Sequence, residues 1–474
     1  MQKLQHLFWR VGFGPRTKSW EKWTALSEEA WWPKLKDDSK PEPVYFDVAD
    51  SAIKGLFMGV GELGKMERGD LSKADKKEVR EKSRENIRSL NLHWLEEMTH
   101  SKSQLREKIA LFWHGHFASR NLNVLYQQQL LHVIRKGALG NFGDLLRGVS
   151  KSAAMLAFLN NQQNKKQHPN ENFAREVMEL FTLGRGHYSE HDIKEAARAF
   201  TGWGFRMSGD FVFRKFQHDA DEKTVLGKTG KYDGDDVLNI LLEQRQTAYF
   251  IARKMYRFLV NDRPPTDDRV RWLGDRFYDS GYEIMRLLDD IVRSDWFYAP
   301  ENTGNLIKSP VQLWVGIRRA LPLELDNPDA QLLLQRALGQ VLFYPPNVAG
   351  WPGGHNWIDS SSLMLRLRIP QMLYDRSDFA VNAKSDDDQQ MGRMEKSIPR
   401  RRLAGDIDWQ PVSALFNGVS EQEIIPRIAD YLWTGSRKDL PLDVLKKHTD
   451  PRSRDALVKT AMLQIMATPE YQMC

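Results

Sequence analysis

Apolar residues recur every three or four positions along most of the chain, a spacing that is typical of helices packed on one face. The clearest example lies between Ala74 and Thr99, where a long charged segment carries Ile87, Leu90, Trp94 and Leu95 on one helical face. The same spacing predicts further helices after His100, over residues 125–137 and 142–158, from residue 235, over residues 246–260 and beyond residue 404.

Two helices in the middle of the chain carry start and stop signals. Pro169 and Asn170 open the segment PNENFAREVMELFTLG, and Gly184 can end this helix in the left-handed region. In the next helix, Ser189 and Asp192 have the spacing of a capping box in which Asp takes the place of Glu. These signals predict two consecutive helices joined by a short loop.

The strongest β signal follows these helices. Phe211 and Phe213 stand beyond a Ser-Gly-Asp turn at residues 208–210, which predicts a short hairpin near residues 204–216. We therefore expect a mainly α fold: a large irregular helical domain with one short β-hairpin and long ordered loops.

Polar and charged residues dominate the segment between Asp378 and Arg402, which includes the run VNAKSDDDQQMGRMEKSIPRRR. Few large apolar side chains are available there to bury, so we predict a mobile loop or linker over residues 378–404. The predicted organisation is a main helical domain over residues 1–377, this linker, and a C-terminal helical segment over residues 405–474 that packs on the main domain.

Composition narrows the class of protein. The 474 residues include 69 Lys and Arg against 63 Asp and Glu, and a net charge of +6 is too small to indicate nucleic-acid binding. The only cysteine is Cys474, so neither an intramolecular disulfide nor a cysteine-based metal cluster is expected. No stretch is apolar enough to span a membrane, and the first thirty residues lack a signal-peptide pattern, so we expect a cytoplasmic protein.

Eight segments, in this order, resemble a large bacterial family known as domain of unknown function 1800: HLFWRVGFGP, REKIALFWHGHFAS, NENFAREVMELFTLGRGHYSEHDIKEAARAFTGW, HDADEKTVLGKTG, FIARKMYRFLV, SPVQLWVGIRRAL, PPNVAGWPGGHNWI and TPEYQMC. They extend over nearly the whole chain. The resemblance implies no established activity. It implies a possible partner, since family members often occur beside proteins of domain of unknown function 1501, which resemble sulfatases and phosphatases. Many members carry export signals, and the missing signal-peptide pattern in the first thirty residues leads us to expect that this chain departs from them.

Two histidines in FWHGHF are candidate metal ligands, because His-x-His is a common ligand spacing on strands. On a helix His116 follows the apolar stripe and His114 points to the opposite side. Both can reach one metal ion only if the helix ends near Trp113. The alternative is a buried His116 that donates to a backbone carbonyl, with His114 in solvent.

Two glutamates lie one helical turn apart, at Glu176 and Glu179. Partial burial and mutual repulsion would raise a carboxyl pKa, which suits a general acid or base or a divalent-cation site. The alternative is ion pairing with Arg175, Arg185 or Arg198, because structural ion pairs also perturb carboxylates.

Two further histidines occur near loops. His187 stands just before a predicted helix cap, in a loop that a rigid scaffold would position. His218 neighbours Asp219 after the predicted hairpin, where it is a candidate ligand or base, or only part of a turn.

The segment PPNVAGWPGGHNWI is a candidate ligand-binding loop. Its glycines at positions 350, 353 and 354 would let the backbone approach a ligand. Trp351 and Trp357 offer flat faces for a sugar ring or a base, and His355 adds a polar group. Alternatively, the two tryptophans pin a long loop to the body of the protein.

The sequence contains no GxSxG, HExxH or GxGxxG motif that follows a strand, and no phosphate-binding loop. The leading hypothesis is therefore a hydrolase with a metal or carboxylate/histidine site, in which one glutamate activates water. Its candidate residues are His114 or His116, Glu176, Glu179, His187 and His218. The cofactor stays open, with a divalent metal ion as the candidate and haem less favoured. The alternative is a non-catalytic binding or assembly partner of the sulfatase-like protein.

Overall fold

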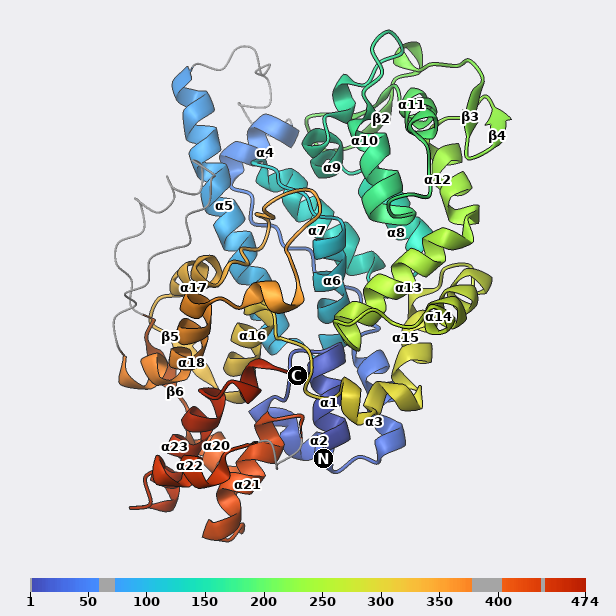
Figure 1. Ribbon diagram of the computed structural model, residues 1–474. Helices are drawn as coiled ribbons and strands as arrows, with labels where there is room; N and C mark the ends of the chain where they lie inside the picture. Colours follow the sequence, from blue (N-terminus) through green and yellow to red (C-terminus); the bar gives the residue numbers. More distant parts are fainter. Residues whose placement is uncertain (1, 59–72, 377–402, 436–439) are drawn as a thin grey trace.

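The computed structural model describes residues 2–58, 73–376, 403–435 and 440–474, and these residues are mainly helical (Figure 1). The fold class predicted from the sequence is confirmed. The helices of the first half are α1 (Gln2–Val11), α2 (Trp20–Thr24), α3 (Glu28–Asp38), α4 (Ser51–Met58), α5 (Lys73–His100), α6 (Gln104–His116), α7 (Val124–Gly137), α8 (Phe142–Ser150), α9 (Ala153–Phe158), α10 (Glu171–Glu176) and α11 (Glu190–Ala199).

The second half of the chain continues the same pattern. Its helices are α12 (Gly234–Glu243), α13 (Arg245–Leu259), α14 (Asp267–Asp279), α15 (Ile284–Val292), α16 (Pro310–Ala320), α17 (Ala330–Leu338), α18 (Ser360–Asp375), α20 (Gln410–Ala414), α21 (Glu421–Leu432), α22 (Leu442–Lys447) and α23 (Arg454–Met466). Short 3₁₀ turns join several of them, among them Gly354–Trp357.

Three two-stranded antiparallel sheets occur among the described residues. The predicted hairpin is present as β1 (Trp203–Phe205) paired with β2 (Phe211–Phe213). A second hairpin, β3 (Lys223–Val225) with β4 (Lys228–Gly230), follows it in the chain. The third sheet joins β5 (Leu323–Leu325) to β6 (Gly405–Ile407), which the sequence pattern did not predict.

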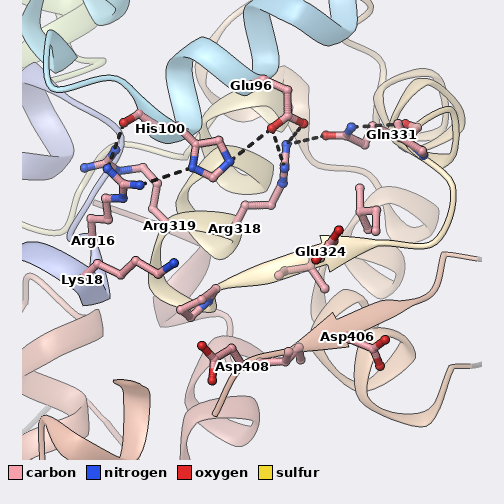
Figure 2. A pocket seen from close by; sticks show the side chains of 15 residues that line it. Arg16, Lys18, Glu96, His100, Arg318, Arg319, Glu324, Gln331, Asp406 and Asp408 are labelled. Carbon is pink, nitrogen blue, oxygen red and sulfur yellow. Dashed lines mark hydrogen bonds and ion pairs between the residues drawn. The ribbon is translucent and has the colours of Figure 1, made fainter. Parts of the chain in front are cut away.

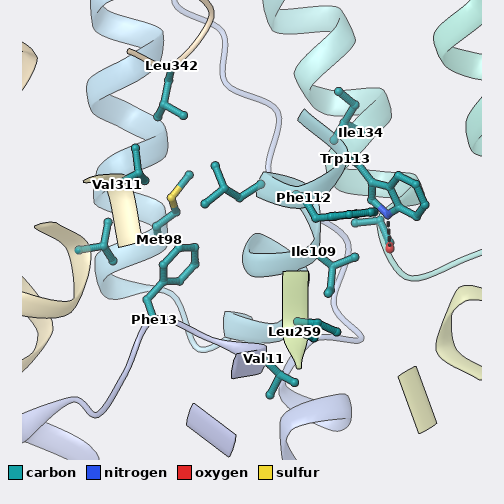
Figure 3. Packing of buried hydrophobic residues seen from close by; sticks show 14 of the residues in the cluster. Val11, Phe13, Met98, Ile109, Phe112, Trp113, Ile134, Leu259, Val311 and Leu342 are labelled. Atoms are coloured by element: carbon teal, nitrogen blue, oxygen red, sulfur yellow. Dashed lines mark hydrogen bonds between the residues drawn. The ribbon is translucent and has the colours of Figure 1, made fainter. Parts of the chain in front are cut away.

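The hydrophobic core extends through most of the described helices, and Figure 3 shows the part of it where α1, α5, α6, α7, α13 and α16 meet. In this region α6 contributes Ile109, Phe112 and Trp113, while α1 and α13 contribute Val11 and Leu259. The four apolar residues that define the predicted face of α5 are each at most 1% exposed. Burial of this stripe, rather than local helix propensity, is what fixes so charged a helix in place.

One buried ion pair ties three of these helices together. Arg135 of α7 contacts the carboxylate of Glu107 on α6 through its Nε, 2.9 Å from Oε2, and its Nη2, 2.9 Å from Oε1. The indole N–H of Trp94 on α5 donates to the same carboxylate at 2.9 Å. Because the pair is bidentate and hydrogen-bonded, the carboxylate is satisfied in an apolar interior.

The helix predicted from Pro169 onward changes its winding halfway along. Asn170 caps α10 by accepting from the Asn172 N–H. From Val177 to Thr182 the chain continues as a π-helix, and Gly184 takes a φ of +81° just beyond it. The predicted capping box of Ser189 and Asp192 is present at the start of α11. The wide π turn is local, and such turns are frequent at functional sites.

Residues 405–474 contact the rest of the molecule at several points. The hydroxyl oxygen of Tyr431 on α21 lies 2.9 Å from the hydroxyl oxygen of Thr17. In addition, α23 packs against α18. Most of the predicted linker, residues 378–402, lies outside the described residues, so the division into domains stays a prediction. Within the described ranges, every helix is too short or too polar to cross a lipid bilayer.

Candidate functional site

A polar pocket of about 620 Å³ lies between α5, α16 and the β5–β6 sheet; we call it the α16–β5 pocket (Figure 2). Figure 2 shows Arg16 and Arg319 on one side of it and Asp406 and Asp408 on the sheet side. The pocket therefore presents both signs of charge. Whether its basic groups need a ligand depends on whether they already have partners inside the protein.

Most of those basic groups are already partnered inside the protein. Arg318 of α16 makes two ion-pair contacts with Glu96, at 2.7 and 3.0 Å, and His100 Nε2 lies 3.2 Å from the same carboxylate. Burial alone would raise the pKa of Glu96, but His100 and Arg318 lower it to about 2. Arg319 donates to the carbonyl oxygens of Gly14 and Thr99. This network satisfies the buried charges of Arg318, Arg319 and Glu96 without a ligand.

A second pocket, of about 320 Å³, lies among α1, α6, α13 and two later segments; we call it the α6–α13 pocket. Its walls are largely aromatic and apolar, and polar and cationic side chains interrupt them. The described residues that line it are Trp9, Arg10, Lys108, Leu111, Phe112, Gly115, His116, Lys254, Arg257, Phe258, Asp262, Leu306, Ile307, Ser309, Gln312, Gln340, Ala349, Trp351, Gly353, Gly354, Trp357 and Cys474. Three of the residues predicted from the sequence are among them: His116, Trp351 and Trp357.

The glycines of the 349–357 segment shape this pocket differently from the prediction. Gly350 has a φ of +86°, and a side chain there would meet the carbonyl oxygen of Gly115 at 2.4 Å. Gly354 has a φ of +59°, and a side chain there would clash even more closely with the carboxylate of Asp262. These two glycines therefore allow the segment to lie against the protein itself. Their close approach closes one side of the pocket and places Trp351 at its wall.

The two histidines of α6 have separate surroundings. The helix continues through His116, so the condition for a shared metal ion, a helix that ends near Trp113, is not met. His114 is buried, whereas the alternative placed it in solvent, and its Nε2 accepts from the Phe343 N–H at 3.2 Å. Its ring also contacts Trp351, with 5.3 Å between centroids. His114 thus supports the tryptophan that lines the pocket.

His116 lines the pocket itself. Its Nε2 lies 3.2 Å from the carbonyl oxygen of Phe181, so the N–H at Nε2 donates to that oxygen. Burial and the nearby ammonium of Lys254 lower the pKa of His116 well below its ordinary value. The imidazole is therefore neutral at neutral pH, and its buried Nδ1 carries a lone pair without a hydrogen-bond partner among the described residues.

The deepest part of the pocket is cationic. Lys108 of α6 is 2% exposed, and its Nζ donates to the carbonyl oxygen of Trp9 at 3.2 Å. Arg10 of α1 is 1% exposed and donates to backbone and amide oxygens, including those of Leu259, Val260 and Asn305. Neither side chain has an Asp or Glu partner in the described part of the chain, although Arg10 Nη2 donates to a main-chain oxygen of Cys474 at 2.7 Å.

Lys254 of α13 is the least satisfied of these cations. It is half-buried and sits 5.1 Å from the centroid of the Phe250 ring. No hydrogen bond or ion pair joins its ammonium to another described residue. Burial lowers its pKa to about 8. Burial also lowers the pKa of Lys108 to about 7; Arg10 acts in the same direction and Cys474 in the opposite one.

The predicted glutamate pair lies apart from this pocket. Glu179 forms an ion pair with Arg185 and accepts from the hydroxyl of Tyr188, and these contacts lower its pKa. Glu176 is half-buried, and burial together with Glu179 raises its pKa, as predicted. Arg175 pairs instead with Glu171 and Glu190.

The remaining predicted histidines are also outside the α6–α13 pocket. His187 and His355 are exposed. His218 Nδ1 lies 3.0 Å from the carbonyl oxygen of Thr201, in the turn that follows β2. In the described ranges, no group of three or more His, Cys, Asp or Glu side chains is arranged to hold a metal ion. The structure therefore does not bring the proposed hydrolase residues together around one pocket.

The cations of the pocket were missed by sequence reasoning, which searched for histidines and acids. Lys108 lies in REKIALFW and Lys254 in FIARKMYRF, where aromatic and aliphatic neighbours surround a single positive charge. Because α6 is buried on all sides, a charged residue in it has no solvent-facing side to occupy. A lysine within such an apolar helical segment was the sequence feature that could have indicated a buried cation.

Comparison with known proteins gives one family. The model of the family described as "Protein of unknown function (DUF1800)" matches residues 6–473, and the chain belongs to this family. No curated protein and no solved structure matches the chain.

Proposed function

We propose that this member of the DUF1800 family binds a small-molecule ligand in the α6–α13 pocket. The observation that carries the proposal is the convergence of three distant segments on one cavity: α6 with Lys108 and His116, α13 with Lys254, and the segment with Trp351 and Trp357. A volume of about 320 Å³ is within the usual range for small-molecule sites.

The lining has the composition expected of such a site. Aromatic and aliphatic side chains supply much of the walls, and a few polar groups without internal partners remain to fix the orientation of a ligand. Lys254 and the Nδ1 of His116 are two such groups. Trp351 is half-buried at the wall, where its indole can cover one face of a flat ligand.

Crystals soaked with a set of flat-ring fragments, neutral and charged, test the proposal directly. We expect fragments in the α6–α13 pocket, with a ring against Trp351. In solution, Trp351→Ala should weaken binding of the best fragment about tenfold or more, because an aromatic contact in a desolvated pocket contributes on the order of 1–2 kcal/mol. Isothermal titration calorimetry measures this loss.

The matched control is Trp272→Ala. Trp272 lies on α14, is 43% exposed and is absent from the pocket lining, so its removal should leave fragment affinity unchanged. Fragments that bind only elsewhere, or an equal loss of affinity in both variants, would overturn the proposal.

Two finer hypotheses stay predictions. The first is hydrolysis at a metal or carboxylate/histidine site. Of the residues predicted for that site, His116 is the one that lines this pocket. Assembly with a sulfatase-like protein is tested by co-purification of the two proteins, with Trp351→Ala as the first variant to examine. A cytoplasmic location likewise stays a prediction, and fractionation of cells tests it.

A further inference from the structure

The charge of the α6–α13 pocket is unbalanced. Its described lining includes four cationic side chains, Arg10, Lys108, Lys254 and Arg257, against the single carboxylate of Asp262. That carboxylate is already engaged, since Arg257 Nη2 lies 2.8 Å from its Oδ1. Among the other three cations, Arg10 donates from Nη2 to a main-chain oxygen of Cys474 at 2.7 Å, and neither Lys108 nor Lys254 has an Asp or Glu side chain within ion-pair distance in the described ranges.

Two of these cations keep hydrogen-bond donors free. An ammonium group has three N–H donors. Lys108 uses one, toward the carbonyl oxygen of Trp9, and that oxygen also accepts from Gln312 Nε2 at 2.8 Å. Lys254 uses none toward a described residue. Arg10 differs, because its Nη1 and Nη2 donate to five oxygens, so it contributes charge more than free donors.

The two lysines come from different helices and line the same pocket. Lys254 and Phe258 are one turn apart on α13, and so share a face. The Lys108 ammonium lies 5.3 Å from the centroid of the Phe258 ring. The ammonium of Lys254 also acts electrostatically on His116, at the end of the helix that carries Lys108. Both lysines therefore line the same cavity, Lys108 with its ammonium beside Phe258 and Lys254 with its ammonium beside Phe250.

Buried charges in proteins are normally paired, because removal of an unpaired charge from water is strongly unfavourable. Lys308, nearby, shows how this chain satisfies a cation for structural purposes. Its Nζ donates to the Tyr471 carbonyl oxygen at 2.6 Å and lies 3.6 and 3.7 Å from the ring centroids of Trp9 and Tyr471. Lys254 has no comparable set of contacts.

We infer that the ligand of the α6–α13 pocket is an organic anion, whose phosphate, sulfate or carboxylate group is held by Lys254 in a pocket that the charges of Lys108 and Arg10 also favour for an anion, while an attached flat ring packs against the aromatic wall. This inference rests on the proposed function, because it names the class of ligand for the same site. The three anionic groups share the chemistry of oxygen acceptors for charge-assisted hydrogen bonds.

A series of naphthalene compounds separates the anion from the ring. The probes are 1-naphthyl phosphate, 1-naphthalenesulfonate, 1-naphthoate and the neutral 1-naphthalenemethanol, each titrated by calorimetry into the full chain near neutral pH. We expect at least one anionic probe to bind about tenfold or more tightly than the neutral one, because a charge-assisted hydrogen bond contributes about 1.5–3 kcal/mol. The order among the three anions identifies the preferred group.

Variants of Lys254 assign the effect to the pocket. Lys254→Met should bring the affinity of the anionic probes down to that of 1-naphthalenemethanol, whereas Lys254→Arg should retain most of it. Lys151→Met is the matched control, because Lys151 lies outside the pocket lining, beside Asp235 and the ring of Trp203. Lys254 is half-buried on the wall of a cavity, so its replacement leaves the core packing in place, and circular dichroism verifies the fold of each variant.

The outcomes distinguish this inference from the proposed function. Equal affinity for all four probes, abolished by Trp351→Ala, would overturn the anionic ligand and leave the ligand site standing. Binding of none of the probes, together with an empty pocket in soaked crystals, would overturn both. Anion binding that Lys254→Met does not change would also overturn the inference.

Discussion

Replacement of Lys108 by methionine should raise the free energy of unfolding near neutral pH. The Lys108 side chain is 2% exposed, and burial, with a smaller effect from Arg10, lowers its pKa to about 7 in the folded chain. In an unfolded chain a lysine has a pKa of about 10.4. The folded protein therefore binds this proton less tightly, and the protonated side chain lowers stability. Methionine fills a similar volume without a charge.

The magnitude follows from the two pKa values. Their difference corresponds to roughly 4–5 kcal/mol, at about 1.4 kcal/mol per pH unit. The variant loses a hydrogen bond to the Trp9 carbonyl oxygen and contacts of the ammonium with the rings of Phe13 and Phe258, together on the order of 1–2 kcal/mol. That carbonyl oxygen keeps its bond from Gln312, so no acceptor is left unpaired. The expected net gain is about 3 kcal/mol.

The sign of the pH dependence is fixed by the same values. Below about pH 7 lysine is protonated in both states, and the full unfavourable effect is present. Between about pH 7 and pH 10 the folded chain loses the proton first, so the stability of the parent protein rises with pH relative to the variant. The advantage of Lys108→Met should therefore be greatest at or below pH 7 and shrink toward pH 10.

Urea denaturation followed by tryptophan fluorescence at several pH values measures the difference. For a chain of this length, about 3 kcal/mol corresponds to a rise in Tm of roughly 3 °C near pH 7. Lys194→Met, at an exposed position of α11, is the control and should show neither the gain nor its pH dependence. A loss of stability at every pH, or a gain that is the same at pH 6 and pH 9, would refute the argument from buried charge.

Three other predictions follow from the structure. Arg135→Met should lower the free energy of unfolding by about 3–5 kcal/mol, because it leaves the buried Glu107 carboxylate without its ion-pair partner and with only the Trp94 N–H; addition of Glu107→Gln should recover part of this loss in urea denaturation. Affinity for 1-naphthyl phosphate should fall as pH rises through the pKa values of Lys108, about 7, and Lys254, about 8, with net proton uptake on binding in calorimetry at pH 8; an affinity independent of pH would contradict this. His114 should bind no metal ion, since its imidazole accepts from a backbone N–H. Elemental analysis of protein purified without chelators checks this, and a stoichiometric metal that is lost in His114→Ala would contradict it.

The elements that the sequence predicted well depend on residues close together in the chain. The capping box of Ser189 and Asp192 spans three positions, and the β1–β2 hairpin is closed by its own turn. The buried face of α5 follows from apolar spacing alone. In each case the interactions that define the element are local, so the pattern contains the information that determines it.

The parts that were missed depend on contacts between distant residues. β5 and β6 pair across a gap in sequence of about eighty residues, and neither three-residue strand has a pattern of its own. The π-helix from Val177 to Thr182 has the same apolar spacing as an α-helix at this length. The sequence indicated that the loop glycines allow a close approach of the backbone. It could not indicate that Gly350 approaches Gly115, because this requires knowing that α6 ends beside the loop.

Neighbouring residues on α6 show why the candidate site lies at Lys108 rather than at the residues with the most familiar catalytic chemistry. Glu107 and Lys108 are both buried and charged, and sequence alone gives no reason to treat them differently. Glu107 receives Arg135 and Trp94, which satisfy its carboxylate inside the fold. Lys108 donates one hydrogen bond to a carbonyl oxygen. It lines a cavity that is also lined by Lys254, which has no hydrogen-bond partner among the described residues. A charge that the fold satisfies internally is explained by stability, whereas a charge left facing a cavity lowers stability and is retained only if something outside the chain completes it. The same comparison separates Glu179, which Arg185 and Tyr188 satisfy, from Lys254, and it favours the α6–α13 pocket as the candidate site.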